Sequence, residues 1–210
     1  MSGSYLGPEF SDLDIKLMAK KYDAKFIYHA NTSGLSVNTA QLISEGNVIG
    51  WFQGRMEFGP RALGGRSILG DARNEDMQKK LNLKIKYRES FRPFAPAVLA
   101  EDCPKYFEYK GTSPYMLVVQ DVLKSRQNKL PDHFNSLGLR EKLYYKRSDI
   151  PSITHIDFSA RIQTVHKETN PRVWDLLNEF KNVTGEGILV NTSFNAVSYT
   201  HLTLPTNREV

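Results

Sequence analysis

Six short apolar segments constrain the fold of this chain more than any other feature of its sequence. They occupy residues 25–29, 48–52, 94–99, 115–119, 160–165 and 187–191. Each has the length and apolar character of a strand. We therefore predict a sheet whose strands come from widely spaced parts of the chain.

Helical patterns lie between the predicted strands, but strands and helices do not alternate regularly. Caps and apolar spacing predict helices over residues 11–24, 38–46, 74–83, 137–143 and 171–185. This mixed order indicates an α/β or α+β fold with a twisted mixed sheet flanked by helices. The 210 residues contain no internal repeat and no convincing linker.

Positive charge is confined to one part of the chain. The sequence has 28 Lys and Arg residues against 23 Asp and Glu residues, which gives a net charge of +5. Residues 54–92 contain ten of the basic residues and five of the acidic ones, so this window carries the whole excess. Charge concentrated in this way is typical of an anion site, and the anion could belong to nucleic acid, a membrane surface or a phosphorylated small molecule.

Composition excludes several classes of protein. The single cysteine, Cys103, excludes a disulfide framework and a cysteine-rich zinc site. The five histidines have no metal-ligand spacing, so we predict no metal site. No stretch approaches the roughly 20 apolar residues of a membrane-spanning helix, and no signal pattern opens the chain. A soluble cytoplasmic protein is the expected class.

The window begins with a segment rich in glycine and arginine. Residues 54–73 contain five glycines and four arginines, among them Arg55 and Arg61. Glycine lets backbone N–H groups approach a ligand closely, and arginine matches phosphate or carboxylate oxygens with paired hydrogen bonds. The segment predicts an oxyanion cradle, although it matches neither common nucleotide-binding glycine motif. The alternative is a turn-rich connection with solvated arginines.

A second basic cluster follows at residues 84–92. If this segment is extended, Lys84, Lys86 and Arg88 project from one face, an arrangement that needs an anion to neutralise it. The alternative is a solvated edge strand whose lysines discourage aggregation.

Two late strands carry polar residues that suit ligand binding. Arg161 lies in the predicted strand 160–165, and Asn191, Ser193 and Asn195 lie at the end of the last predicted strand and just beyond it. Polar side chains at the carboxyl end of a strand are well placed to hold a ligand in an α/β sheet. The alternative is turn capping by Ser, Thr and Asn.

Four motifs in order resemble the carbamoyltransferases of antibiotic and nodulation-factor biosynthesis. The motifs are GRMEFGPRALGGRSIL, KIKYRESFRPFAPAVL, SARIQTV and ILVNTSFN. The resemblance is to the C-terminal, YrdC-like domain of that family and covers residues 4–195, so the predicted domain is 1–195. It implies a domain that binds ATP, with Mg²⁺, and carbamoyl phosphate, and that forms carbamoyl adenylate. A kinase-like N-terminal domain, expected to be absent from this chain, would transfer the carbamoyl group to a hydroxyl acceptor.

The resemblance also implies roles for individual residues. It assigns catalytic roles to Arg61, Lys86 and Arg161, with Lys84 as the residue that could exchange roles with Lys86. It assigns ATP or carbamoyl phosphate binding to the following residues: Arg55, Arg88, Asn191, Ser193 and Asn195.

The resemblance ends before the chain does. Residues 196–210 read AVSYTHLTLPTNREV and match no family motif, so we expect a foreign, artefactual or disordered tail. Two alternatives to the enzyme remain: a YrdC-like RNA-binding module that uses the basic window, and a truncated remnant that folds without turnover. Sparse aromatic residues in the window count against RNA binding.

Overall fold

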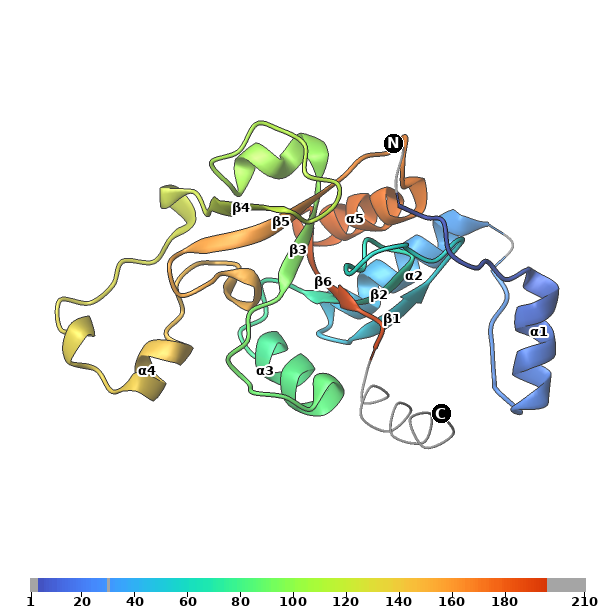
Figure 1. Ribbon diagram of the computed structural model, residues 1–210, viewed down its shortest axis with the longest axis horizontal. Helices are drawn as coiled ribbons and strands as arrows, with labels where there is room; N and C mark the ends of the chain where they lie inside the picture. Colours follow the sequence, from blue (N-terminus) through green and yellow to red (C-terminus); the bar gives the residue numbers. More distant parts are fainter. Residues whose placement is uncertain (1–3, 30, 196–210) are drawn as a thin grey trace.

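The computed structural model describes residues 4–29 and 31–195, and its centre is one six-stranded sheet (Figure 1). The strand order is β1-β2-β6-β3-β5-β4. The strands are β1 (Ile49–Phe52), β2 (Arg66–Asp71), β3 (Ala95–Leu99), β4 (Val118–Asp121), β5 (Ser159–Val165) and β6 (Ile188–Ser193). The α-helices are α1 (Asp12–Lys21), α2 (Thr32–Ser44), α3 (Met77–Leu81), α4 (Leu139–Tyr144) and α5 (Pro171–Thr184). This mixed sheet with flanking helices confirms the predicted α/β class.

Strand direction decides which residues share an edge of the sheet. Strands β3 and β5 are parallel, whereas β6 is antiparallel to both of its neighbours, β2 and β3. The carboxyl end of β6 therefore lies beside the amino-terminal ends of β3 and β5. Ala95 of β3 stands opposite Asn191 of β6, and two residues further along β3 Ala97 stands opposite Gln163 of β5. Arg161 and Asn191 thus belong to one row across the sheet.

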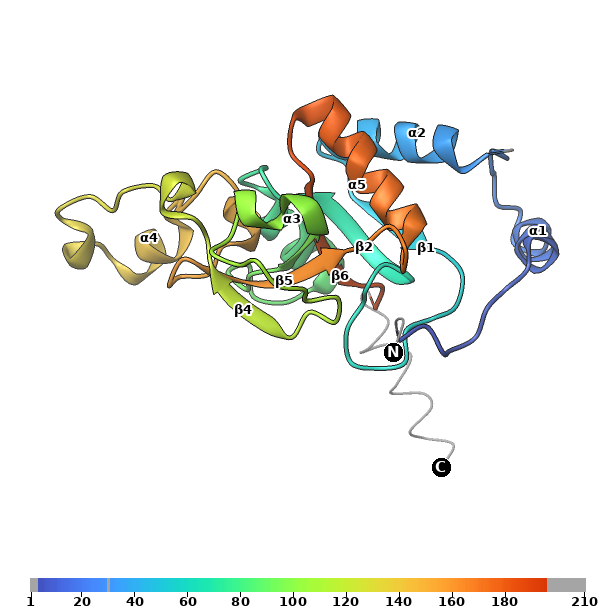
Figure 2. The same ribbon diagram turned by 90° about the horizontal axis from the view of Figure 1, so that it is seen from above.

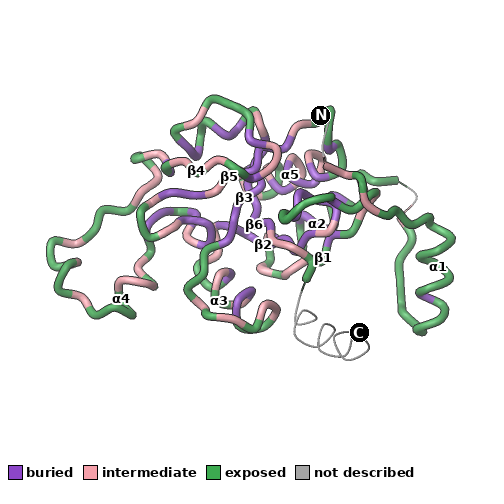
Figure 3. Tube along the Cα trace, in the orientation of Figure 1, coloured by how far each residue is buried: buried purple, intermediate pink, exposed green. Residues whose placement is uncertain are grey.

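Both faces of the sheet are covered, because alternate side chains of the central strands join different cores. Leu189 packs with α2 and α5, whose buried residues include Ile43 and Phe180. Its neighbours Ile188 and Val190 pack on the opposite face. Figure 2 shows α2 and α5 together on one side of the sheet, and Figure 3 shows the buried central strands. Successive side chains of a strand point to opposite faces of the sheet. Because both faces are buried here, these strands are apolar at nearly every position.

Strand β2 was not predicted, because its segment was interpreted as loop. Five of its six residues are buried, and it pairs with β1 on one side and β6 on the other. Gly70 fits there because a Cβ would lie 2.8 Å from Met77 Sδ. Pairing on both sides outweighs the weak strand preference of a glycine-containing segment.

One predicted strand is absent, and two predicted boundaries are wrong. Residues 25–29 contain no strand, α2 begins at Thr32 with Asn31 as its cap rather than near Asn38, and β4 begins at Val118 rather than at residue 115. Met116 has a φ of +58°, which no strand residue adopts, so that strand cannot begin earlier. The predicted tail, residues 196–210, lies outside the described residues.

The two ends of the molecule are less buried than its centre. Helix α1 stands away from the sheet at one end, and the segment around α4 extends from the other (Figures 1 and 2). Within the described residues, no helix is long and apolar enough to cross a membrane.

Candidate functional site

A cavity of about 170 Å³ opens where the carboxyl end of β6 meets the amino-terminal ends of β3 and β5. It lies on the sheet face that α2 and α5 cover further along the strands. Five residues that the sequence analysis selected line it together: Arg61, Arg88, Arg161, Asn191 and Ser193. We call this the cationic pocket. Residues up to 132 positions apart in the sequence therefore line the same cationic pocket.

Arg161 reaches the cationic pocket from β5. Its guanidinium Nε is buried and has no hydrogen-bond partner among the described residues. Burial lowers the pKa of Arg161, and the nearby charge of Arg61 lowers it further. A half-buried cation beside a second cation is unfavourable unless an anion joins them.

Asn191 has an unpaired hydrogen-bond acceptor, whereas Arg161 has an unpaired donor. Its side chain is almost fully buried, and its Nδ2 donates to Gln163 Oε1 (2.7 Å) and to the carbonyl oxygen of Ala62 (3.1 Å). Its Oδ1 is buried and accepts no hydrogen bond from any described residue. Two residues that line the pocket thus each carry one buried polar atom without a partner among the described residues, the donor Arg161 Nε and the acceptor Asn191 Oδ1. Buried polar groups normally have partners.

Lys86 lies beside the end of β6. Its Nζ donates to the carbonyl oxygen of Ser193 and to Asn195 Oδ1, the latter at 2.7 Å. Burial, and then the charge of Arg88, lower the pKa of Lys86 to about 8. Lys84 is exposed, so the structure places Lys86 and not Lys84 against the end of β6.

The basic segment that carries Lys86 is helical, so the extended conformation considered for it does not occur. Asn82–Lys86 forms one turn of π-helix, and Tyr87 ends it in the left-handed conformation with a φ of +48°. Lys84, Lys86 and Arg88 therefore do not project from one strand face. Single π-turns are rare and occur frequently at functional sites.

Asn82 fixes the loop that carries Arg88. Its Oδ1 accepts from Arg88 Nε (2.7 Å), and its Nδ2 donates to the carbonyl oxygens of Ser90 (3.1 Å) and Arg92 (2.8 Å). The Arg88 guanidinium also lies 5.1 Å from the centre of the Phe94 ring. The sequence analysis missed Asn82, because only its position after folding distinguishes it from other polar helix residues.

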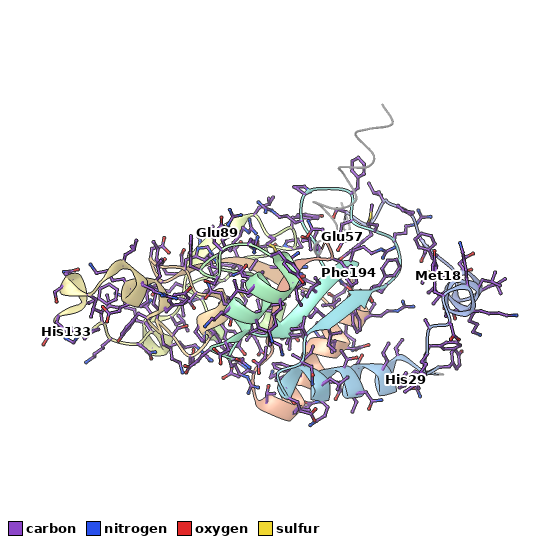
Figure 4. All side chains as sticks on the ribbon, turned by 90° about the horizontal axis from the view of Figure 1, so that it is seen from below. Met18, His29, Glu57, Glu89, His133 and Phe194 are labelled. Atoms are coloured by element: carbon purple, nitrogen blue, oxygen red, sulfur yellow. The ribbon has the colours of Figure 1, made fainter. Side chains whose placement is uncertain are left out.

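Glu57 organises the glycine-rich segment and was also missed. Its buried carboxylate accepts from the backbone N–H groups of Leu63 (2.7 Å), Gly65 (2.7 Å) and Arg66 (3.1 Å). Figure 4 labels Glu57 on this segment, away from both ends of the molecule. The predicted oxyanion cradle thus exists, but it holds an anion of the chain itself. The backbone N–H groups of Leu63, Gly65 and Arg66 are therefore already paired with Glu57.

Arg55 lies outside the cationic pocket. Its Nε is 3.7 Å from Glu9 Oε2, and its Nη1 donates weakly to the carbonyl oxygen of Gly7 at 3.4 Å. It lines a different cavity, next to Gln53 and Arg172. The structure therefore does not bring Arg55 together with the other predicted residues.

The cations of the site lack acidic partners. Within residues 4–29 and 31–195, Arg61, Lys86, Arg88 and Arg161 make no ion pair. Elsewhere basic residues do find carboxylates, as Arg73 does with Asp71 at 2.7 Å. Three of these cations line the cavity, and Lys86 lies beside the end of β6. Cations without acidic partners create a strong local preference for an anion.

Comparison with known proteins identifies the relatives of this chain. The family model described as "Carbamoyltransferase C-terminus" matches residues 40–207, a range that extends past residue 195. An uncharacterised protein of Synechocystis is 55% identical over 196 residues, covering 93% of this chain and 32% of that protein. Nodulation protein NolO of Bradyrhizobium diazoefficiens is 43% identical, covering 77% of this chain and 26% of NolO. The 3'-hydroxymethylcephem-O-carbamoyltransferase of Streptomyces clavuligerus is 38% identical, covering 73% of this chain and 25% of that protein. The chain spans about a third or less of the length of these relatives.

Glu57→Gln should destabilise the segment that carries Arg61. An amide keeps one acceptor oxygen but turns an NH₂ group toward backbone N–H groups, so at least one of them loses its partner. We expect the free energy of unfolding to fall by about 1–3 kcal/mol, as measured by urea denaturation. The control is Glu168→Gln, which changes an exposed glutamate. Equal stability of the two variants would contradict the role of Glu57.

Lys86 should titrate near pH 8 instead of at the ordinary lysine value of 10.5. NMR of the lysine side chains would measure this, and Arg88→Ala should raise the pKa because it removes a neighbouring positive charge. Between about pH 8 and 10.5 the unfolded chain keeps this proton while the folded chain has lost it, so the contribution of Lys86 to stability should increase with pH there. A Lys86 pKa near 10.5 would refute the assignment.

Proposed function

The chain belongs to the carbamoyltransferase C-terminus family, and we propose that it binds carbamoyl phosphate and ATP in the cationic pocket and forms carbamoyl adenylate. The observation that carries this proposal is that Arg61, Arg88 and Arg161 line one cavity and make no ion pair with any described residue. Both proposed substrates are polyanions, and their phosphates supply the charge that the pocket lacks.

The polar groups of the pocket match the two ends of carbamoyl phosphate. Arg161 has an unused buried donor and Asn191 an unused buried acceptor. Carbamoyl phosphate has phosphate oxygens that accept from Arg161 and an amide nitrogen that donates to Asn191 Oδ1. A ligand with both groups satisfies both residues.

The proposed reaction breaks two bonds to phosphorus and forms two. Water attacks the phosphorus of carbamoyl phosphate, its bond to the carbamoyl oxygen breaks, and carbamate and inorganic phosphate form. A carbamate oxygen then bonds to the α-phosphorus of ATP while the bond to the β-phosphate bridge breaks, and pyrophosphate leaves. Arg61, Lys86 and Arg161 neutralise negative charge on the phosphates, and Asn191 orients the carbamoyl group. Such chemistry depends mainly on positioning and electrostatic stabilisation.

Mg²⁺ enters this proposal only with the nucleotide. Among the described residues there is no group of three or more His, Cys, Asp or Glu side chains that could hold a metal ion. The residues of the pocket therefore do not fit a resident Mg²⁺ site, and no step is assigned to one. ATP would bring the ion on its own phosphates.

Transfer of the carbamoyl group would need more than this domain. The Streptomyces clavuligerus relative is named as an O-carbamoyltransferase, and this chain covers 25% of it. We propose that the product formed here passes to a kinase-like N-terminal domain, which transfers the carbamoyl group to a hydroxyl acceptor.

Arg61→Ala and Arg161→Ala should each weaken binding of carbamoyl phosphate. Each removes charge-assisted hydrogen bonds of about 1.5–3 kcal/mol, which corresponds to a roughly 10- to 100-fold higher Kd by calorimetry. Arg140→Ala, which removes an exposed arginine on α4, is the matched control and should bind normally. Pyrophosphate release that depends on carbamoyl phosphate tests the chemical step.

Other results would favour the alternatives. If the purified chain bound neither ATP nor carbamoyl phosphate but bound RNA with a steep salt dependence, the RNA-binding module would replace the enzyme. Normal binding without pyrophosphate release would identify an inactive remnant.

Asn191 should determine the preference for a carbamoyl group. Acetyl phosphate has a methyl group where carbamoyl phosphate has NH₂, so it cannot donate to Asn191 Oδ1. The wild-type chain should bind carbamoyl phosphate about tenfold more tightly than acetyl phosphate, because a buried acceptor left unpaired costs about 1–3 kcal/mol. Asn191→Leu should abolish this preference, even if both ligands then bind more weakly. Equal binding of the two ligands by the wild type would contradict the assignment.

A further inference from the structure

Residues 4–29 form an N-terminal arm whose apolar side chains are largely exposed among the residues that the structure describes. We propose that the N-terminal arm is the docking surface for the part of the longer carbamoyltransferase polypeptide that lies outside the C-terminal domain. This inference concerns assembly and does not depend on what the cationic pocket binds.

Helix α1 exposes its apolar side chains instead of burying them. Leu13 is 65% exposed, and Leu17 and Met18 are each 57% exposed, whereas Ala19 is the only buried residue of the helix. Figure 3 shows α1 as an almost wholly exposed element, and Figure 4 places Met18 far from His133 at the other end of the molecule. A helix of a globular protein normally turns such side chains toward a core.

Apolar and aromatic side chains are also exposed in the second half of the N-terminal arm. Phe26, Ile27 and Tyr28 are 63%, 84% and 64% exposed. This is the segment predicted as a strand, and within the described residues it pairs with none of the strands of the sheet. An apolar segment with strand character but no strand partner is typical of a surface that another polypeptide completes.

The contacts within the N-terminal arm are too few to stabilise it. Its two halves meet through Lys16 Nζ, which lies 5.1 Å from the centre of the Tyr28 ring, a contact of roughly 0.5–1 kcal/mol at an exposed site. A helix of ten residues is marginal in water without packing, even with the capping box that Ser11 and Asp14 form here. A covering surface would supply the burial that α1 lacks.

The relatives indicate which polypeptide provides that surface. The family model begins at residue 40, so the N-terminal arm precedes the conserved C-terminal domain. The alignment with the Synechocystis protein nevertheless spans 196 of 210 residues, and the 14 left over are fewer than the 26 of the N-terminal arm. That relative therefore shares at least part of the arm, and 68% of its length lies outside the match. The unmatched part is the occupant we propose.

Docking on the N-terminal arm would also affect the segment that lines the cationic pocket. The start of the N-terminal arm pairs with the segment that carries Arg61, because Gly7 N donates to Met56 O (2.9 Å) and Met56 N donates to Pro8 O (3.0 Å). Tyr5 Oη donates to the carbonyl oxygen of Leu63 at 2.8 Å. A partner that holds the arm therefore also restrains the segment on which Arg61 lies.

Photo-crosslinking in the full-length Synechocystis protein tests the proposal. A photoreactive amino acid is placed at the position aligned with Leu17 or Ile27, and a control is placed at the position aligned with Leu139. Leu139 is also exposed (77%) but lies on α4, at the far end of the molecule. The arm positions should cross-link to peptides of the same chain outside the matched region, and the control should not. Cross-links to a second copy, or yields no higher than the control, would overturn the proposal.

Hydrogen exchange gives a second, independent readout without any substrate. Amides of the N-terminal arm should exchange at least about tenfold more slowly in the full-length relative than in this chain, because docking suppresses local opening. Amides of α4 should exchange at similar rates in both proteins. Fast exchange of the arm in both proteins would refute the docking role while leaving the proposed function untouched.

Discussion

The buried carboxylate of Glu57 holds together the segment on which the site depends. Three backbone N–H groups on the far side of a glycine-rich turn converge on this one side chain. The turn is tight enough that a Cβ at Gly64, where φ is +106°, would lie 2.6 Å from Val173 Cγ2 on α5. The glycines thus serve two purposes, a left-handed backbone and close contact with α5. With this turn fixed, Arg61 is held above the end of β6.

Mixed strand direction supplies the other half of the site. If β6 were parallel to β3 and β5, its carboxyl end would lie at the opposite edge of the sheet from Arg161. The antiparallel placement of β6 instead brings Asn191 into the same row as Arg161, with Ala95 between them. The small side chain of Ala95 leaves space above the sheet, and that space is part of the cationic pocket. Topology and side-chain size together produce a cavity in a region of otherwise dense packing.

The sequence predicted those parts of the molecule that depend on local pattern. Strands β3, β5 and β6 and helix α5 could be predicted because their apolar residues are continuous or helically spaced. Arg161, Asn191 and Ser193 could be selected because polar residues beside buried strands are unusual. Strand β2 could not be predicted, because its stability comes from pairing on both sides rather than from its own residues. The roles of Glu57 and Asn82 could not be predicted from the sequence either. Each side chain binds backbone groups that come close to it only after folding.

The π-turn at Asn82–Lys86 carries a consequence for how this site could arise in evolution. Each residue of an α-helix advances by about 100° around the axis, and a π-turn holds one more residue than an α-turn. Loss of a single codon here would restore an ordinary turn and rotate Lys86 away from the end of β6, while the remainder of the helix stayed intact. A single inserted residue, without any new helix or strand, is therefore enough to move a lysine from the surface of the helix to a position against Ser193.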